Sequence, residues 1–335
     1  MAVRGSKGGT TRRRGSRVAA GSVAAVAILW ITTTVAAAAF GRWGSAVSVE
    51  SIAGTSAQFN TPYLDGCPIQ APDGLSFYMA TNRPGGAGGI DIWVAHRTTT
   101  SAPWGAPVNL GTPVNSAADD FCPTPVRGKR LFFVSSRPGG CGGADIYVTR
   151  RDRTGTWDVP TNLGCTVNSP AGEASPSLIT AGPDVLYFSS SRAGGFAPEV
   201  GTAPDSDIYV SALGAGGAFG APELAPGVNT SSEDARPNVR KDGLEIVFDS
   251  NRPGTLGGPD IYSATRAAVG DAWSVPTNLG AAINTASSES RASLSWDGST
   301  LVFGSNRPGS EPDPVTGAPS NDIYTSTRAK TGGGN

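Results

Sequence analysis

Five segments of the sequence carry one motif, and this repeat constrains the fold more than any other feature of the chain. The motif reads Ser-Asn-Arg-Pro-Gly or a close variant, and a glycine-rich stretch then leads to Asp-Ile-Tyr or Asp-Ile-Trp. Its arginine recurs every 54 to 60 residues, at Arg83, Arg137, Arg192, Arg252 and Arg307. Units of this length that cannot bury a hydrophobic face alone either pack around an axis or stack into a solenoid.

Each unit contains the pattern of four short strands. The first strand carries Cys-Pro or an equivalent pair, and the second places two apolar residues six and four positions before the arginine, such as Phe77 and Met79. This spacing of two is typical of one buried strand face. The third strand begins at Asp-Ile-Tyr or Asp-Ile-Trp, and the fourth lies near a Pro-Thr-Asn-Leu-Gly segment. The sequence therefore predicts an all-β protein built from four-stranded units.

The two ends of the repeat region favour a closed ring over a solenoid. The fifth unit reaches its third strand at 322–324 and lacks a fourth, whereas residues 42–60 resemble 272–284, with Trp43 and Asn60 in the places of Trp273 and Asn284. An N-terminal strand that completes the last unit would remove an open sheet edge. We therefore predict a five-bladed β-propeller over residues 41–330, closed by an N-terminal strand, with a stacked solenoid as the alternative.

The motif resembles the bacterial WD-like propeller repeat of the TolB type. The residues that carry the resemblance are the Ser-Asn-Arg-Pro-Gly and Asp-Ile-Tyr segments together with Asn-Leu-Gly and Val-Asn, over roughly 43–328. The chain departs from TolB in having five units and no separate N-terminal domain. The resemblance implies a periplasmic or extracellular binding propeller, and it names no ligand, because a fold does not determine a function.

The first 40 residues differ from the rest of the chain. Six basic residues precede an uncharged apolar run at 18–40, which is typical of a secretory signal and is also long enough for an uncleaved membrane anchor. We predict that residues 1–40 are a signal peptide or an N-terminal anchor, that 331–335 form a flexible tail, and that the protein is secreted or held in the cell envelope. The net charge of −1 argues against a nucleic-acid partner.

A charged residue stands at each root of the hairpin that joins the second and third strands. We predict that each motif arginine and the aspartate at the start of the third strand fix the hairpin, either as a charged pair or through hydrogen bonds to the backbone. The predicted pairs are Arg83–Asp91, Arg137–Asp145, Arg192–Asp207, Arg252–Asp260 and Arg307–Asp322.

One acid lies two residues before the Cys, Ser or Arg of each first strand, and strand directions place all five acids on one face near the axis. They are Asp65, Asp120, Glu173, Asp234 and Glu289. One interpretation is that each acid accepts hydrogen bonds from its own strand start. The other is a cation or sugar site, with calcium as a candidate cofactor.

The second-to-third turns of units 3 and 5 are seven residues longer than the others and lie on the same face. They add Glu199, Asp205, Glu311 and Asp313. Because binding residues tend to lie on loops that depart from a repeat, we predict that this is the ligand face, with the two long turns flanking blade 4.

The four cysteines also fall on this face. An even number of cysteines in an exported chain is typical of disulfides. We predict Cys141–Cys165 and Cys67–Cys122. The single histidine, His96, occupies an ordinary strand position, and nothing around it resembles a nucleophile motif.

Two functions follow from these observations. The first is an exported, monomeric, non-enzymatic propeller without a required cofactor, which binds a protein or a cell-envelope glycan through its loop-rich face. The alternative is a glycosidase with carboxylates at the propeller centre. That chemistry requires two acids in different environments, and the five central acids are copies of one another.

Overall fold

The computed structural model of the chain describes Met1 and residues 39–182, 184–196 and 205–331. The predicted signal or anchor at 1–40 and the tail at 331–335 lie almost entirely outside these residues, as does Glu199. The chain separates into two units, Met1–Ala36 and Ala37–Asn335, and every described strand belongs to the second. Within the described residues, no helix is both long enough and apolar enough to cross a membrane.

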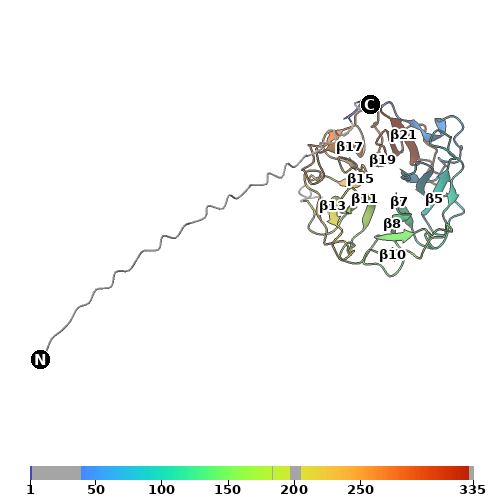
Figure 1. Cartoon of the computed structure of the whole chain (residues 1–335). Coiled ribbons are helices and arrows are strands. Elements are labelled where there is room, and N and C mark those ends of the chain that lie inside the picture. Colours follow the sequence, from blue (N-terminus) through green and yellow to red (C-terminus); the bar gives the residue numbers. More distant parts are fainter. Residues whose placement is uncertain (2–38, 183, 197–204, 332–335) are drawn as a thin grey trace, which may run out of the picture. The chain divides into compact units, whose positions relative to one another are not determined.

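Five four-stranded antiparallel sheets surround a common axis, which confirms the predicted all-β, five-bladed propeller (Figure 1). Blade 1 contains β3 (Asp65–Gln70), β4 (Ser76–Thr81), β5 (Asp91–His96) and β6 (Val108–Asn109). Blade 2 contains β7 (Asp120–Val126), β8 (Arg130–Ser135), β9 (Asp145–Arg150) and β10 (Thr161–Asn162). Blade 3 contains β11 (Glu173–Ile179), β12 (Val185–Ser190), β13 (Asp207–Ala212) and β14 (Glu223–Leu224). Blade 4 contains β15 (Asp234–Val239), β16 (Glu245–Ser250), β17 (Asp260–Thr265) and β18 (Thr277–Asn278).

Blade 5 takes its strands from both ends of the described chain. It contains β19 (Glu289–Leu294), β20 (Thr300–Ser305), β21 (Asp322–Thr327) and, as its fourth strand, β2 (Val47–Ser48). Val47 pairs with Thr325 and Ser48 with Tyr324. The 3-10 helix η1 (Val49–Ser51) follows β2, and β1 (Ala39–Phe40) pairs with β22 (Lys330–Thr331) beside this blade.

A repeated asparagine fastens each fourth-strand segment to the third strand of its blade. In blade 4, Asn284 accepts a hydrogen bond from Ile261 N (2.9 Å) and donates one to Ile261 O (3.0 Å). In blade 5, Asn60 makes the same two bonds to Ile323, at 2.8 and 3.3 Å, across 263 residues of sequence. The N-terminal segment therefore occupies the place that a fourth-strand segment occupies in the other blades.

The blades are held together by hydrophobic layers between neighbouring sheets. The core cluster between blades 3 and 4, for example, combines Ile208 and Tyr187 with Ile246, Phe248 and Trp273. Residues at the two alternating positions predicted for the second strand, such as Phe77 and Met79, are fully buried. Because each layer needs two sheets, no blade can bury its apolar face alone.

The innermost strand of every blade contains a bulge directly after its first two residues. The bulged residues adopt positive φ, between 47° and 55°, which is uncommon outside glycine. They are Cys67, Cys122, Ser175, Arg236 and Arg291. A bulge re-aims its side chain, and these five residues line a narrow axial tunnel of about 30 Å³. The tunnel has room for about one water molecule rather than for a sugar ring.

Candidate functional site

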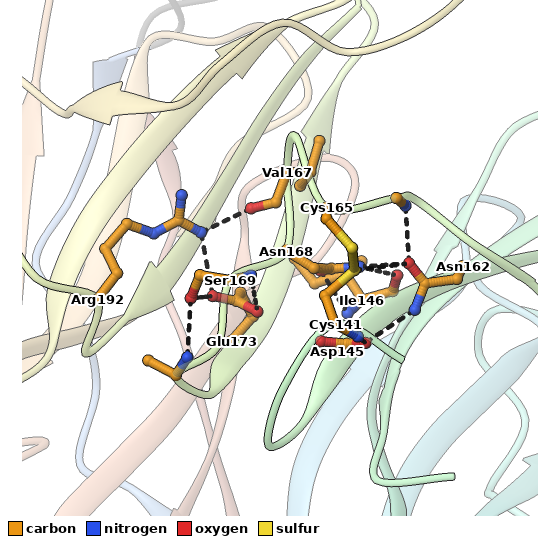
Figure 2. The surroundings of a disulfide bond; sticks show 12 residues. Cys141, Asp145, Ile146, Asn162, Cys165, Val167, Asn168, Ser169, Glu173 and Arg192 are labelled. Atoms are coloured by element: carbon orange, nitrogen blue, oxygen red, sulfur yellow. Dashed lines mark hydrogen bonds and ion pairs between the residues drawn. A yellow bond between two sulfur atoms is a disulfide. The ribbon is translucent and has the colours of Figure 1, made fainter. Parts of the chain in front are cut away.

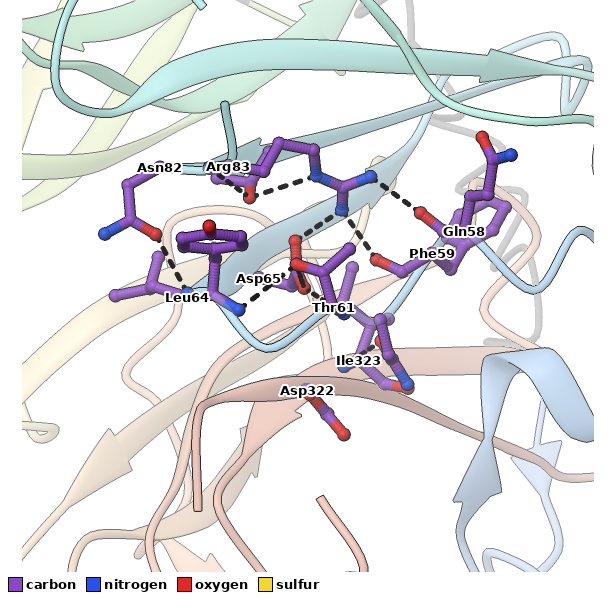
Figure 3. Close-up of polar contacts among 12 residues, drawn as sticks. Gln58, Phe59, Thr61, Leu64, Asp65, Asn82, Arg83, Asp322 and Ile323 are labelled. Atoms are coloured by element: carbon purple, nitrogen blue, oxygen red, sulfur yellow. Dashed lines mark hydrogen bonds and ion pairs between the residues drawn. The ribbon is translucent and has the colours of Figure 1, made fainter. Parts of the chain in front are cut away.

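The motif arginines do not form the predicted pairs, because each one binds the acid of its own first strand instead. Figure 3 shows blade 1, where Arg83 Nη2 donates to Asp65 Oδ1 at 2.5 Å and to Phe59 O at 2.8 Å. The same pairing recurs as Arg137–Asp120, Arg192–Glu173, Arg252–Asp234 and Arg307–Glu289. The charged-pair form of the predicted hairpin contacts, Arg83–Asp91, Arg137–Asp145, Arg192–Asp207, Arg252–Asp260 and Arg307–Asp322, is therefore wrong. The other form, hydrogen bonds to the backbone, holds for the aspartates.

Each of these acids also accepts hydrogen bonds from its own strand start. Asp65 Oδ2 accepts from Thr61 N and Thr61 Oγ1, both at 2.7 Å, and Ser116 serves Asp120 in the same way. All five carboxylate side chains have no exposed surface. A carboxylate that is enclosed and fully engaged in this way stabilises the blade and has no free surface for a ligand.

The aspartate that begins each third strand instead holds its own turn. Asp91 Oδ2 accepts from Ala87 N at 2.5 Å, and Asp145 Oδ2 accepts from Cys141 N at 2.5 Å. In the two long turns the same contact is kept, from Phe196 N to Asp207 (2.6 Å) and from Glu311 N to Asp322 (3.1 Å). The residue whose N–H binds the aspartate stands four positions after the motif arginine in every blade. The extra residues of the two long turns therefore lie between this donor and the aspartate.

Two acids of the predicted ligand face lie in the long turn of blade 5. Asp313 Oδ1 accepts from Val315 N (2.9 Å) and Thr316 N (2.7 Å), so its carboxylate caps a local turn. These backbone donors lower the pKa of Asp313. Glu311 is exposed.

Both predicted disulfides are confirmed. Cys141 in the hairpin turn of blade 2 joins Cys165 in the following connection (Figure 2), and Cys67 joins Cys122 in the lining of the axial tunnel. The figure also shows that the first bond lies beside Asp145 and Asn162, next to the Glu173–Arg192 pair. Two disulfides indicate an extracytoplasmic protein.

The centre of the propeller is not five-fold symmetric, because blades 4 and 5 place charges where blades 1 and 2 place the Cys67–Cys122 bond. Asp249 is enclosed in β16, at a position that holds Ala, Val, Ser or Gly in the other blades. It accepts from Arg236 Nη1 and from Arg291 N, the latter at 2.9 Å. Burial raises the pKa of Asp249 while Arg236 opposes that rise. Burial and the neighbouring charge of Arg236 lower the pKa of Arg291 to about 10.

Arg236 connects this buried aspartate to a carboxylate on the outer surface of the same face. Its Nη2 lies 3.4 Å from Glu233 Oε1, and the side chain of Glu233 is 33% exposed. Glu233 directly precedes Asp234, which pairs with Arg252. We call each pair of a motif arginine and its first-strand acid a clamp. Sequence reasoning missed Glu233 and Asp249, although both break the repeat.

Glu233 and Asp205 hold paired positions across the junction of blades 3 and 4. Asp234 N donates to Ser206 O at 2.9 Å, which fixes the two backbones side by side. At equivalent junctions, a Cβ at Gly89 would lie 2.3 Å from Asp119 Oδ1, and a Cβ at Gly258 would lie 2.2 Å from Ser288 Oγ. The two positions of a junction are therefore within reach of each other's side chains.

Carboxylates occupy both facing positions at one junction of the five. The facing residues are Gly89 and Asp119, Gly143 and Gly172, Asp205 and Glu233, Gly258 and Ser288, and Ser320 and Leu64. Burial raises the pKa of Asp205, and the charge of Asp234 adds to that rise. The junction thus places one carboxyl group whose pKa is raised by burial near another that lies next to an arginine.

Two aspartates near the long turns are expected to make stability depend on pH. Burial raises the pKa of Asp207 and of Asp322 to about 6, against about 3.9 in an unfolded chain. The folded protein therefore binds more protons than the unfolded chain between these values, so the stabilisation is complete below about pH 4 and is lost as the pH rises through 6. Each of the variants Asp207→Asn and Asp322→Asn lacks one of these titrating groups and therefore its loss of stability. The difference in unfolding free energy between variant and native protein should therefore shift by about 2–3 kcal/mol in favour of the variant from pH 4 to pH 8. Urea unfolding across this range measures the gain, and parallel stability curves would contradict the assignment.

Among the described residues, no group of three or more His, Cys, Asp or Glu side chains is arranged to hold a metal ion. No protein-family model matches the sequence, and no curated protein matches it.

Solved structures match the fold over most of the chain. A thermostable family-43 glycoside hydrolase superposes with a TM-score of 0.53 at 13% identity, covering 84% of this chain and 94% of its own. The catalytic domain of the Coprinopsis cinerea GH62 α-L-arabinofuranosidase gives 0.53 at 13%, covering 86% and 97%. A putative TolB from Agrobacterium tumefaciens gives 0.45 at 15%, covering 80% and 78%. At these identities the superpositions show the fold alone.

The neighbours nevertheless correct the leading functional prediction. A non-enzymatic propeller that binds a protein or a cell-envelope glycan is contradicted, because the structural neighbours are mainly family-43 and GH62 glycoside hydrolases. The glycosidase alternative agrees better with this set.

Proposed function

We propose that the protein is a glycoside hydrolase whose reacting carboxyl groups are Asp205 and Glu233. The observation that supports this most strongly is the single junction at which both facing positions carry acids. Residues that the fold requires recur in every blade, whereas a pair that occurs at one junction is not required by the repeated fold.

The two acids differ in the way that glycoside hydrolysis requires. One carboxyl group must donate a proton to the glycosidic oxygen while the other, ionised, activates water or attacks the sugar. Asp205 suits the first role because burial raises its pKa. Glu233 suits the second because its side chain is 33% exposed and lies 3.4 Å from the guanidinium of Arg236.

Arg236 and Asp249 act in this proposal as positioning residues. Asp249 is only 1% exposed and cannot touch a substrate, but it accepts a hydrogen bond from Arg236 and so restricts that side chain. Because the axial tunnel holds about 30 Å³, the sugar would lie over the tunnel mouth rather than inside it. The protein would meet this substrate outside the cytoplasm, with residues 1–40 as signal or anchor.

Pentose glycosides are the first substrates to test, because the structural neighbours include proteins named as an α-L-arabinofuranosidase and a xylan β-1,4-xylosidase. Aryl arabinofuranosides and xylosides, together with arabinoxylan, should release sugar. We expect Asp205→Asn and Glu233→Gln each to lower kcat at least about 100-fold, as loss of a general acid or base does. Asp205→Asn should also remove the alkaline limb of the pH–rate profile.

Asp119→Asn is the matched control, because Asp119 holds the place of Glu233 at the junction of blades 1 and 2 and faces a glycine. This variant should keep full activity, since an asparagine can still accept the hydrogen bond from Ile90 N. Equal loss in all three variants, or no hydrolysis of any glycan tested, would count against the proposal.

A further inference from the structure

A cleft of about 580 Å³ lies between blades 1 and 2, on the face opposite Asp205 and Glu233. Its walls are the turns between first and second strands and between third and fourth strands. Because neighbouring strands are antiparallel, these turns lie at the other end of the strands from the hairpin turns. The cleft is therefore separate from the proposed active site.

Positive charge dominates this cleft. Five cationic side chains line it, against two carboxylates, Asp73 and Asp152. The cations are Arg127, Lys129, Arg130, Arg151 and Arg153. In the described part of the chain, Arg130 alone among them forms an ion pair, with Asp184 at 3.2 Å. Even with Asp184 counted, five cations against three carboxylates leave an excess of two positive charges.

The two lining carboxylates are engaged by their own turns rather than by the arginines. Asp152 Oδ1 accepts from Thr154 N (2.8 Å) and Thr156 N (2.9 Å), and Asp73 Oδ1 accepts from Leu75 N (2.8 Å). A carboxylate tied to its own backbone is poorly placed to form a bidentate pair with a guanidinium. Arg151 Nε donates to Gly155 O at 2.7 Å, so the cleft offers a ligand chiefly the guanidinium groups of Arg127 and Arg153.

Four of the five cationic residues are not part of the repeated scaffold. Arg151 is part of it, because Arg97, Arg266 and Arg328 hold the same place in blades 1, 4 and 5 and each lies over a tryptophan ring, as Arg151 lies over Trp157. The other four lie in the blade 2 turns that read Val-Arg-Gly-Lys-Arg (126–130) and Arg-Asp-Arg (151–153). The stretches that correspond to 126–130 in blades 1 and 3, 71–75 and 180–184, contain no Lys or Arg, and Thr99 holds the place of Arg153 in blade 1. Since blades 1 and 3 build the same turns without these four residues, their charges serve something other than the fold.

Aromatic rings accompany the charges. Trp157 is half-buried in the cleft wall, with the Arg151 guanidinium 5.7 Å from its ring centre. Beyond the cleft, Arg127 and Lys241 both lie over the ring of Trp296, at 5.1 and 5.2 Å. Two like charges over one ring extend the positive surface from blade 2 toward blade 5.

We propose that this cleft binds an acidic glycan, with arginines pairing with uronate carboxylates and Trp157 covering a sugar ring. Guanidinium groups match carboxylates in planar, two-point geometry, and an indole offers a flat apolar surface with one polar edge. The choice of a glycan over other polyanions rests on the proposed function. The site would hold a charged polysaccharide while the opposite face cleaves its linkages.

Calorimetric titration of the full chain with oligogalacturonides, and separately with neutral xylo-oligosaccharides, tests this site. We expect the uronate to bind and the neutral chain to bind at least tenfold more weakly. Arg127→Gln with Arg153→Gln should raise the Kd for uronate at least tenfold and reduce its salt dependence, because two screened ionic contacts are lost. Trp157→Ala should weaken binding without changing that salt dependence.

The control double variant, Arg150→Gln with Lys330→Gln, removes the same charge from exposed positions outside the cleft and should bind normally. Equal weakening of uronate binding in the two double variants would overturn the site, because it would indicate non-specific attraction to the net positive charge of the surface. Polyphosphate binding tighter than uronate with the same cleft dependence, or no uronate binding, would overturn the glycan assignment. Asp205→Asn should bind uronate normally, so a failed hydrolysis assay and a failed binding assay remain distinguishable.

Discussion

Deletion of residues 42–56 is expected to lower the melting temperature by more than about 10 °C and to cause self-association. The deletion removes β2 and Trp43, whose ring lies 4.2 Å from the Arg328 guanidinium, and leaves β21 as an open edge. It also removes Val49, which is 1% exposed. Differential scanning calorimetry and light scattering measure both effects.

Two substitutions separate ring closure from local damage. Asn60→Ala and Asn115→Ala each remove two side-chain hydrogen bonds and leave the N–H of one isoleucine unpartnered, Ile323 across the closure and Ile92 within blade 1. Each should cost about 2–4 kcal/mol. A much smaller cost for Asn60→Ala, or an unchanged melting temperature after the deletion, would show that the N-terminal segment does not close the ring.

Breaking one arginine–acid clamp is the second large effect. Arg137→Gln removes the partner of Asp120, whose carboxylate has no exposed surface, and should cost about 3–5 kcal/mol because a buried charge is left uncompensated. Combining it with Asp120→Asn should recover part of that loss, which a double-mutant cycle in urea measures. Arg150→Gln, on the exposed end of β9 in the same blade, should change stability by less than about 0.5 kcal/mol. Strict additivity of the two clamp substitutions would show that the pair is not coupled.

The repeat made most of the fold predictable. The steps between motif arginines set the blade number, and the two-residue spacing of Phe77 and Met79 marked a strand face that the structure buries. Trp43 and Asn60 marked the fourth strand of blade 5 because they match Trp273 and Asn284 in type and order. The disulfides followed because strand direction places all four cysteines near one face.

The clamp partners were misassigned because the sequence offers two acids near each arginine. The aspartate of the third strand is nearer along the hairpin, but its separation from the arginine changes from 8 residues, as in Arg83 to Asp91, to 15, as in Arg192 to Asp207. The first-strand acid keeps nearly constant spacing, from Asp65 to Arg83 and from Glu173 to Arg192. That regularity was the available signal.

The candidate active site was harder to predict. Asp205 and Glu233 lie 28 positions apart, at the ends of different blades, and only the blade junction brings them together. The burial that raises the pKa of Asp205 is not displayed by the sequence. Comparing the junction positions of all five repeats would have singled out this pair, because acids occupy both positions at this junction alone.

The most direct measurement of the central claim is ¹H NMR of the anomeric protons during incubation of the full-length protein with arabinoxylan. We predict that signals of a released pentose grow with the native protein and with Asp119→Asn, and that they are absent with Asp205→Asn and Glu233→Gln, all four being equally folded. Sugar release that persists at the native rate in the Asp205→Asn and Glu233→Gln variants would contradict the assignment of these two residues as the reacting carboxyl groups.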